Sequence, residues 1–241
     1  MFNIVFITCL LALCSISYEL LLAQTLSTVM GNTVLRYSVT IGLYIASLGF
    51  GAIIYGKKKY SENLLKNLVN VEVLLAIIGA TAPFLILLFD RTVRETGGLL
   101  GLEYTGFVPQ AAVFLFNHSM ILAIGILSGM ELPMLIDLAR KKSDNDERAI
   151  NKVLAADYTG SMLGVIAFAF ILLPGYGVFL SSCFLAMINI LIAIYLDYSE
   201  NKKEISGRRI ISLSFILILI LFFLFSDPIE GFFINKIYLS L

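Results

Sequence analysis

The sequence predicts an all-α integral membrane protein, a bundle of seven transmembrane helices. Composition is the first observation, because 59% of the 241 residues are hydrophobic and only 14% are charged, against about 25% charged residues in soluble domains. The second is the recurrence of apolar runs of about 20 residues, the length that crosses a bilayer core of roughly 30 Å. The 17 basic and 17 acidic residues balance, so no nucleic-acid partner is indicated.

Seven apolar segments have the required length. They lie at about 3–24, 35–56, 68–89, 109–138, 153–173, 176–196 and 209–226. Because only Pro174-Gly175-Tyr176-Gly177 separates the fifth segment from the sixth, we expect these two to form a tight helical hairpin. A single transmembrane domain then covers residues 1–241, with an interfacial tail at 227–241. The first segment is expected to be an ordinary span, since no Lys or Arg precedes it as in a removable signal.

Basic residues between the segments predict the orientation. Thirteen of the 17 fall in loops on the N-terminal side of the bundle, at 57–66, 140–152 and 202–209, and four fall on the other side. Loops rich in Lys and Arg stay in the cytoplasm. The N-terminus is therefore expected in the cytoplasm and, with seven spans, the C-terminus outside, in a multi-pass protein of the cell inner membrane.

Small residues at helical spacing predict where helices pack, since they let two backbones approach closely in a bilayer. Gly42 lies in the second segment, in a ridge with Ser38 and Ala46. The other candidates are Gly125 and Gly129 in the fourth segment, and Gly160 and Gly164 in the fifth.

Acidic side chains within apolar segments are the main candidates for function, because each costs several kcal/mol unless it is paired, protonated or hydrated. Glu19, Glu131 and Asp157 share helix faces with small or polar residues, so we expect them to face protein or an internal cavity. Together with their neighbours Tyr18 and Tyr158, they are the predicted substrate or ion pathway.

Pro133 follows Glu131 by two residues. Its missing N–H predicts a local break in the helix that offers carbonyl oxygens beside Glu131. An alternative is that Glu131 and Asp157 reach the headgroups or pair with Arg140, Lys141 or Lys152.

Glu72, His118 and Asn117 are secondary candidates. Glu72 lies close to a loop, and a lone histidine is more often a packing residue than a ligand. One histidine without Cys or acidic residues at ligand spacing makes no metal site. We expect no metal and no cofactor, and we name no catalytic residue because no catalytic motif is present.

Three stretches form a recognisable pattern, namely Ser17-Tyr18-Glu19 followed by Met30-Gly31-Asn32-Thr33 and Gly42 to Gly56, then Gly129-Met130-Glu131-Leu132-Pro133, and then Val153 to Gly164 ending at Pro174 and Gly177. Together they resemble the membrane region at the N-terminus of integral-membrane spermidine-synthase-like proteins. The resemblance implies a helical bundle, distantly similar to half of a major-facilitator transporter. In the fused proteins an aminopropyltransferase domain follows; that domain, and with it aminopropyl transfer, is not expected in this chain.

Two functions remain open. The first is a transporter-like bundle in the lipid bilayer for a small cationic solute such as a polyamine, with a homodimer plausible because seven helices are few for alternating access. The second is a non-catalytic membrane scaffold or accessory subunit, which recruits a separate cytosolic enzyme through its basic loops. An intramembrane enzyme is the weakest option, because carboxyl groups alone define no reaction.

Overall fold

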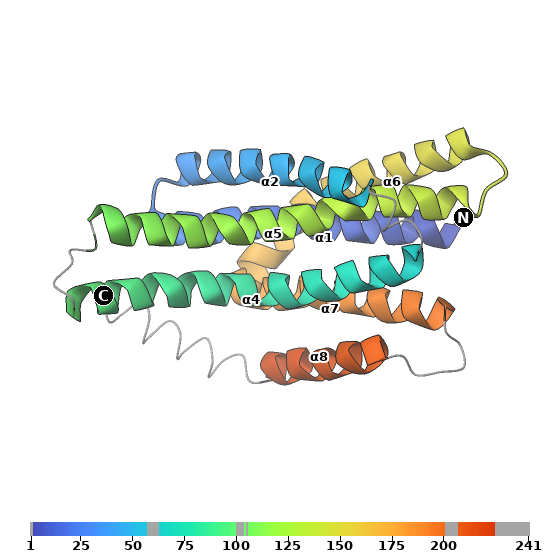
Figure 1. Ribbon diagram of the computed structural model, residues 1–241. Helices are drawn as coiled ribbons and strands as arrows, with labels where there is room; N and C mark the ends of the chain where they lie inside the picture. The colour runs from blue at the N-terminus through green and yellow to red at the C-terminus, as the bar shows by residue number, and fades with distance from the viewer. Residues whose placement is uncertain (1, 57–62, 100–103, 105, 201–206, 225–241) are drawn as a thin grey trace.

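The computed structural model describes residues 2–56, 63–99, 104, 106–200 and 207–224, and these are almost entirely helical, without any strand. The elements are α1 (Phe2–Met30), α2 (Thr33–Tyr55), α4 (Leu64–Leu99), α5 (Phe107–Arg140), α6 (Asp146–Ala167), the π-helix η1 (Phe168–Leu172), α7 (Leu173–Glu200) and α8 (Gly207–Leu224). Figure 1 shows them gathered into an elongated bundle. The predicted all-helical fold class is confirmed.

Five helical stretches in the described part of the chain are long and apolar enough to cross a membrane. They are Phe2–Met30, Thr33–Tyr55, Leu64–Gly97, Phe107–Arg140 and Asp146–Ser199, and they indicate a membrane protein. The prediction of seven spans, and the orientation of the termini deduced from it, are not supported. The fifth and sixth predicted segments belong to one helical stretch, and α8 is not among the five. The predicted tail at 227–241 lies outside the described residues.

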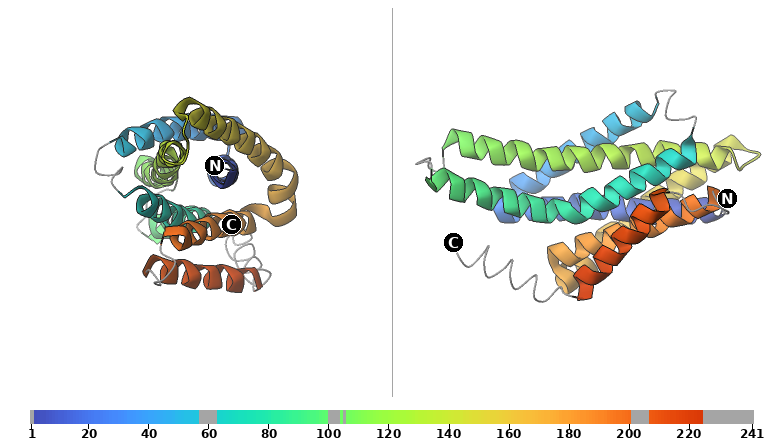
Figure 2. Two further views of the ribbon diagram at one scale, coloured as in Figure 1. Left: turned by 90° about the vertical axis from the view of Figure 1, so that its right-hand side faces the viewer. Right: turned by 60° about the horizontal axis from the view of Figure 1, so that its bottom comes forward.

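Helix α1 is the central element. Viewed end-on, α2, α4, α5, α6 and α7 form a ring around it, with α8 outside the ring (Figure 2, left), and α1 contacts all five of these ring helices. Leu21, Leu22 and Leu26 of α1 are completely buried. A helix that is apolar all round is typical of such an interior position.

Three helix pairs pack most extensively, namely α2 with α5, α1 with α6, and α4 with α7. In the first pair Gly51 of α2 lies against the backbone of Gly129 in α5, so that a Cβ atom on either glycine would overlap backbone atoms of the other helix. In the second pair Gly160 and Gly164 of α6 lie against Cys9 and Leu13 of α1 in the same way. These contacts bring the backbones closer than any larger residue allows.

The ridge predicted in the second segment is on the wrong face of its helix. Ser38, Gly42 and Ala46 are exposed, and nothing lies within 4 Å of a Cβ built on Gly42. Helix α2 instead packs through Thr40, Tyr44, Ser47 and Gly51. The face that carries Tyr44 turns inward, because the tyrosine hydroxyl needs a hydrogen-bond partner and lipid tails offer none.

The predicted hairpin between the fifth and sixth segments is also absent, because α6 packs along α1 whereas α7 packs along α4. The chain passes around α1 through η1, which ends just before Pro174. Proline has no backbone N–H and so cannot continue the hydrogen-bond pattern of the preceding turn. At the same bend the Ser181 hydroxyl of α7 donates to the carbonyl of Leu172 in η1 at 2.9 Å. Gly177 then turns the chain with a φ of 66°, a value that glycine adopts without strain.

The glycine contacts give a first prediction. We expect Gly51→Ala to lower the stability of the detergent-solubilised protein by about 1–3 kcal/mol, since the new methyl group meets the backbone of α5. Gly42→Ala is the matched control on the same helix, because both changes gain the same helix propensity of about 1 kcal/mol but Gly42 faces open space. Thermal unfolding of the two variants measures the difference. Equal melting temperatures would contradict the close approach of α2 and α5.

Candidate functional site

A cavity of about 200 Å³ lies between α1, α2, α5 and α6. This equals the liquid volume of about seven water molecules. Apolar side chains such as Leu48 and Leu132 form part of its wall. The polar side chains that line it are Thr8, Ser15, Glu19, Tyr44, Ser128, Glu131, Asp157 and Ser161. A buried space with this many polar groups is suited to water or a polar ligand.

Three of the predicted pathway residues lie on this cavity, each on a different helix. Glu19 comes from α1, Glu131 from α5 and Asp157 from α6. Glu19 and Glu131 are each 5% exposed, and Asp157 is half-buried. Two of the acids have a serine one turn away on the same face, Ser15 before Glu19 and Ser161 after Asp157, as the spacing of four residues requires.

None of these three carboxyl groups pairs with a cationic side chain among the described residues. The acids that do form ion pairs lie towards helix ends, and their pairs are Arg91 with Glu95, Arg94 with Asp90, Arg140 with Asp137, and Arg208 and Arg209 with Asp197. The alternative in which Glu131 or Asp157 pairs with the nearby loop cations is therefore not seen in the described part of the chain. Each carboxyl group must be protonated, hydrated or bound to an external cation.

The carboxyl groups surround the cavity rather than converge on one point. Within the described ranges, no three His, Cys, Asp or Glu side chains are grouped closely enough to hold a metal ion. A divalent ion needs several oxygen ligands within about 2.6 Å. Acidic groups spread around a wall suit a larger organic cation.

Tyr44 is a lining residue that sequence reasoning missed. Its hydroxyl lies 3.0 Å from the Ser15 hydroxyl, 3.0 Å from the Ser15 carbonyl and 3.1 Å from the Ser128 hydroxyl. It therefore ties α2 to α1 and α5 at the cavity wall. The sequence feature that could have identified Tyr44 is the spacing of Thr40, Tyr44 and Ser47, which places three polar groups on one face of an apolar helix.

Helix α5 continues through Pro133 as one helix from Phe107 to Arg140, so the predicted break is wrong. Flanking turns and the tight packing of Gly129 against α2 hold the helix in register. Proline still has no N–H to give to the carbonyl of Gly129. Gly129 and Pro133 both line the cavity. The helix is therefore unbroken, but the Gly129 carbonyl beside the cavity has no N–H donor from Pro133.

Glu72 and Tyr18 lie behind the cavity and do not line it. Glu72, on α4, is completely buried, and its carboxyl group is near enough to that of Glu131 for each to influence the other. Neither oxygen of Glu72 has a hydrogen bond of normal geometry with a described residue. The ring of Tyr18 lies against Gly79 of α4, and its buried hydroxyl likewise has no partner among the described residues.

The structure does not bring the remaining candidates to this cavity. The His118 Nδ1 donates to the carbonyl of Phe114 at 2.7 Å, and the Asn117 amide donates to the sulfur of Met30 at 3.7 Å. Phe114 and Met30 line a separate cavity of about 510 Å³ at the other end of α5, together with Arg36, Arg94 and Tyr104. Tyr158 is 71% exposed on the outside of α6.

Comparison with known proteins finds no matching family model and no matching solved structure. Several curated proteins are similar in sequence. A polyamine aminopropyltransferase of Oceanobacillus iheyensis is 27% identical over 80% of this chain, one of Leptospira interrogans is 26% identical over 94%, and one of Corynebacterium efficiens is 30% identical over 76%. The chain is related to polyamine aminopropyltransferases.

This relationship supports the resemblance to spermidine-synthase-like proteins that the motifs indicated. The chain spans only part of these relatives, namely 35%, 43% and 33% of the length of the three aminopropyltransferases. That the shared part is the membrane region alone stays a prediction.

The cavity gives a second prediction, tested by thiol labelling of a variant with its three cysteines replaced. We expect Ser161→Cys to react with a small cationic methanethiosulfonate more than about tenfold faster than with an anionic reagent of similar size, since unpaired carboxylates attract cations and repel anions. Mass spectrometry of the labelled protein measures both rates. Ser182→Cys is the buried control, because Ser182 packs on the carbonyl of Ala80. Equal rates for the two reagents at Ser161→Cys would contradict an acidic cavity open to water.

Proposed function

We propose that this chain binds a small cationic solute, such as a polyamine, in the cavity between α1, α2, α5 and α6 and carries it across the membrane. The observation that supports the proposal is the presence of three acids, Glu19, Glu131 and Asp157, on one internal cavity without a cationic partner among the described residues. A cationic ligand supplies the missing charge. Intramembrane acids of this kind mark ion and substrate pathways in membrane proteins.

The other lining groups fit an alkylammonium ligand. An ammonium group has three N–H donors and no acceptor, and the wall offers the hydroxyl oxygens of Ser15, Ser128 and Ser161 beside the carboxylates. The ring of Tyr44 adds a π face of the type that attracts cations. Leu48 and Leu132 suit the methylene groups between the amines.

The relatives add a chemical class to this geometry. Their printed name, polyamine aminopropyltransferase, names polyamines, and this chain is similar to about a third of the length of two of them. We propose that the similar part handles the same class of solute. Catalysis of aminopropyl transfer is not part of the proposal.

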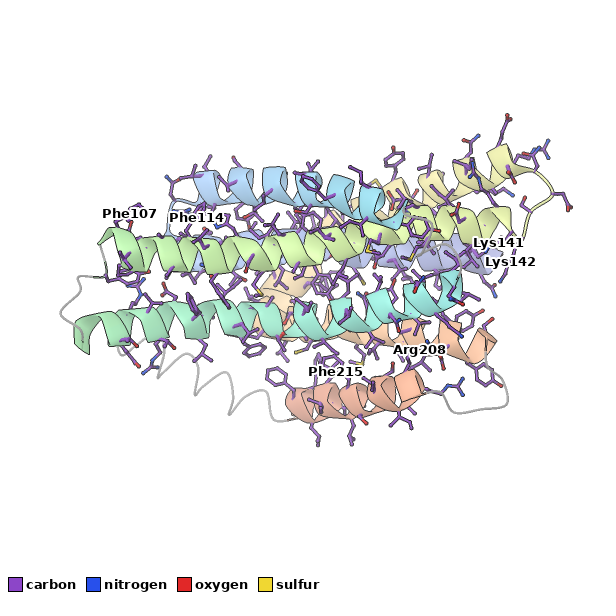
Figure 3. The ribbon with its side chains drawn as sticks, viewed as in Figure 1. Phe107, Phe114, Lys141, Lys142, Arg208 and Phe215 are labelled. Atoms are coloured by element: carbon purple, nitrogen blue, oxygen red, sulfur yellow. The ribbon has the colours of Figure 1, made fainter. Side chains whose placement is uncertain are left out.

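A scaffold is the second candidate, and the basic end of the bundle favours it. Lys141 and Lys142 are exposed in the turn between α5 and α6 (Figure 3), and Arg140 and Arg148 are exposed beside them. Asp144, Asp146 and Glu147 are exposed in or beside the same turn, so the surface carries charges of both signs and suits a partner with a complementary charge pattern, such as a separate cytosolic enzyme. Recovery of an enzyme from native membranes with the wild-type chain, and its loss with Lys141→Glu and Lys142→Glu, would support recruitment.

The third prediction concerns the three acids. We expect Glu19→Gln, Glu131→Gln and Asp157→Asn each to weaken spermidine binding by at least about tenfold, equivalent to about 1.4 kcal/mol, because each removes a carboxylate that pairs with the bound ligand. The triple variant is expected to abolish spermidine uptake into proteoliposomes. Glu95→Gln is the matched control, since Glu95 pairs with Arg91 on the surface. Wild-type binding and uptake by a folded triple variant would overturn the proposed function.

The fourth prediction concerns orientation. We propose that the basic end of the bundle faces the cytoplasm, as loops rich in Lys and Arg do. In the cysteine-free background, Lys142→Cys is expected to react with a membrane-impermeant maleimide only after the cytoplasmic side is opened. Phe107→Cys, at the opposite end of α5 (Figure 3), is expected to react in intact cells. The reverse pattern would contradict this orientation.

A further inference from the structure

Glu72 is a buried acid that the cation site itself does not use. It lies on α4 directly behind Glu131, is completely buried, and has no hydrogen bond of normal geometry to a described residue. The titratable groups around the pair are Cys14, Tyr18 and Glu19 of α1, Tyr44 of α2, Glu131 of α5, Asp157 of α6 and Cys183 of α7. All are acids or groups that are neutral when protonated, and no described cationic side chain faces them.

Two carboxyl groups in this position cannot both ionise at low cost. Each loses its hydration on burial, and a second negative charge beside the first adds repulsion in a medium of low dielectric constant. The pair formed by Glu72 and Glu131 therefore retains at least one proton.

The two members of the pair differ in access. Glu131 lines the cavity, whereas Glu72 does not. Of these two carboxyl groups, a solute in the cavity can contact only that of Glu131. The solute affects Glu72 only through Glu131.

We propose that the Glu131–Glu72 pair exchanges one proton for each cation that enters the cavity, an inference that rests on the proposed function. In the empty cavity both carboxyl groups are protonated. When an ammonium group binds, the O–H bond of Glu131 breaks and its proton leaves through the cavity to water. The Glu131 carboxylate then pairs with the ammonium group, while Glu72 keeps its proton and donates a hydrogen bond to that carboxylate.

At Glu131 the exchange balances charge, since one proton leaves as one ammonium group arrives. The other two ammonium groups of spermidine are balanced by the carboxylates of Glu19 and Asp157 on the same cavity, so no uncompensated charge is created in the bundle. Protons are therefore the coupling ion of this site, and a gradient of protons across the membrane drives the cation in the opposite direction.

The test counts protons. Purified protein in detergent, in weak buffer with a pH indicator dye, is saturated with spermidine, and binding is measured separately by equilibrium dialysis in strong buffer. We expect about one proton released per spermidine bound, and an apparent affinity that rises about tenfold per pH unit while the pair is protonated, as linkage requires. The wild-type proton count needs no variant, so it is independent of how well any variant folds.

Variants assign the proton. Glu131→Gln is expected to release none, with its fold checked by thermal unfolding. Glu72→Gln keeps a neutral donor beside Glu131, so binding and proton release persist. Glu72→Leu removes that donor and is expected to weaken spermidine binding by about tenfold, the effect of losing a hydrogen bond to a charged group.

The outcomes separate the two proposals. Spermidine binding to the wild type without proton release overturns the exchange and leaves the proposed function standing. Proton release that persists in a folded Glu131→Gln variant overturns the assignment to this pair. Absence of spermidine binding to the wild type overturns the proposed function and, with it, the proton exchange that rests on it.

Discussion

A carboxyl group inside an apolar bundle has to be protonated, hydrated or paired, and this constraint governs the arrangement of the acids in this chain. Asp90, Asp137 and Asp197 meet it by ion pairs with arginines towards helix ends. Glu19 and Glu131 have no such partner among the described residues and share a polar cavity instead. The first arrangement compensates each carboxylate charge within the protein. The second leaves carboxyl groups available to a ligand.

The close helix contacts explain how acids from three helices reach one small cavity. Glu131 follows Gly129 by two residues, and Gly129 holds α5 against α2. Asp157 precedes Gly160 by three residues, and Gly160 holds α6 against α1. Each glycine brings its backbone close to the neighbouring helix and so carries the nearby acid towards the interior. Packing and the candidate site thus depend on the same short stretches of sequence.

Composition and apolar segment lengths were enough to predict an all-helical membrane protein, because both follow from the thickness of a bilayer. They were not enough to predict which face of α2 turns inward, since Gly42 and Gly51 carry the same small side chain and only long-range contacts distinguish them. The failure of the predicted hairpin has a similar cause. Proline and glycine indicate a turn, but they do not predict that α1 lies between the two helices that the turn joins. Tyr44 was missed because its partners, Ser15 and Ser128, are distant in sequence.

The unpaired acids also bear on the choice between a transporter and a scaffold. A scaffold needs only its surface, and a bundle with Leu or Gln in place of Glu19, Glu131 and Glu72 would present the same surface. Each buried carboxyl group without a partner costs stability, and a bundle that only recruits another protein gains nothing in return. A solute site gains the charge that its ligand requires. The basic end at Lys141 and Lys142 is compatible with either function, so the interior acids carry the distinction, and they favour a site for a cation.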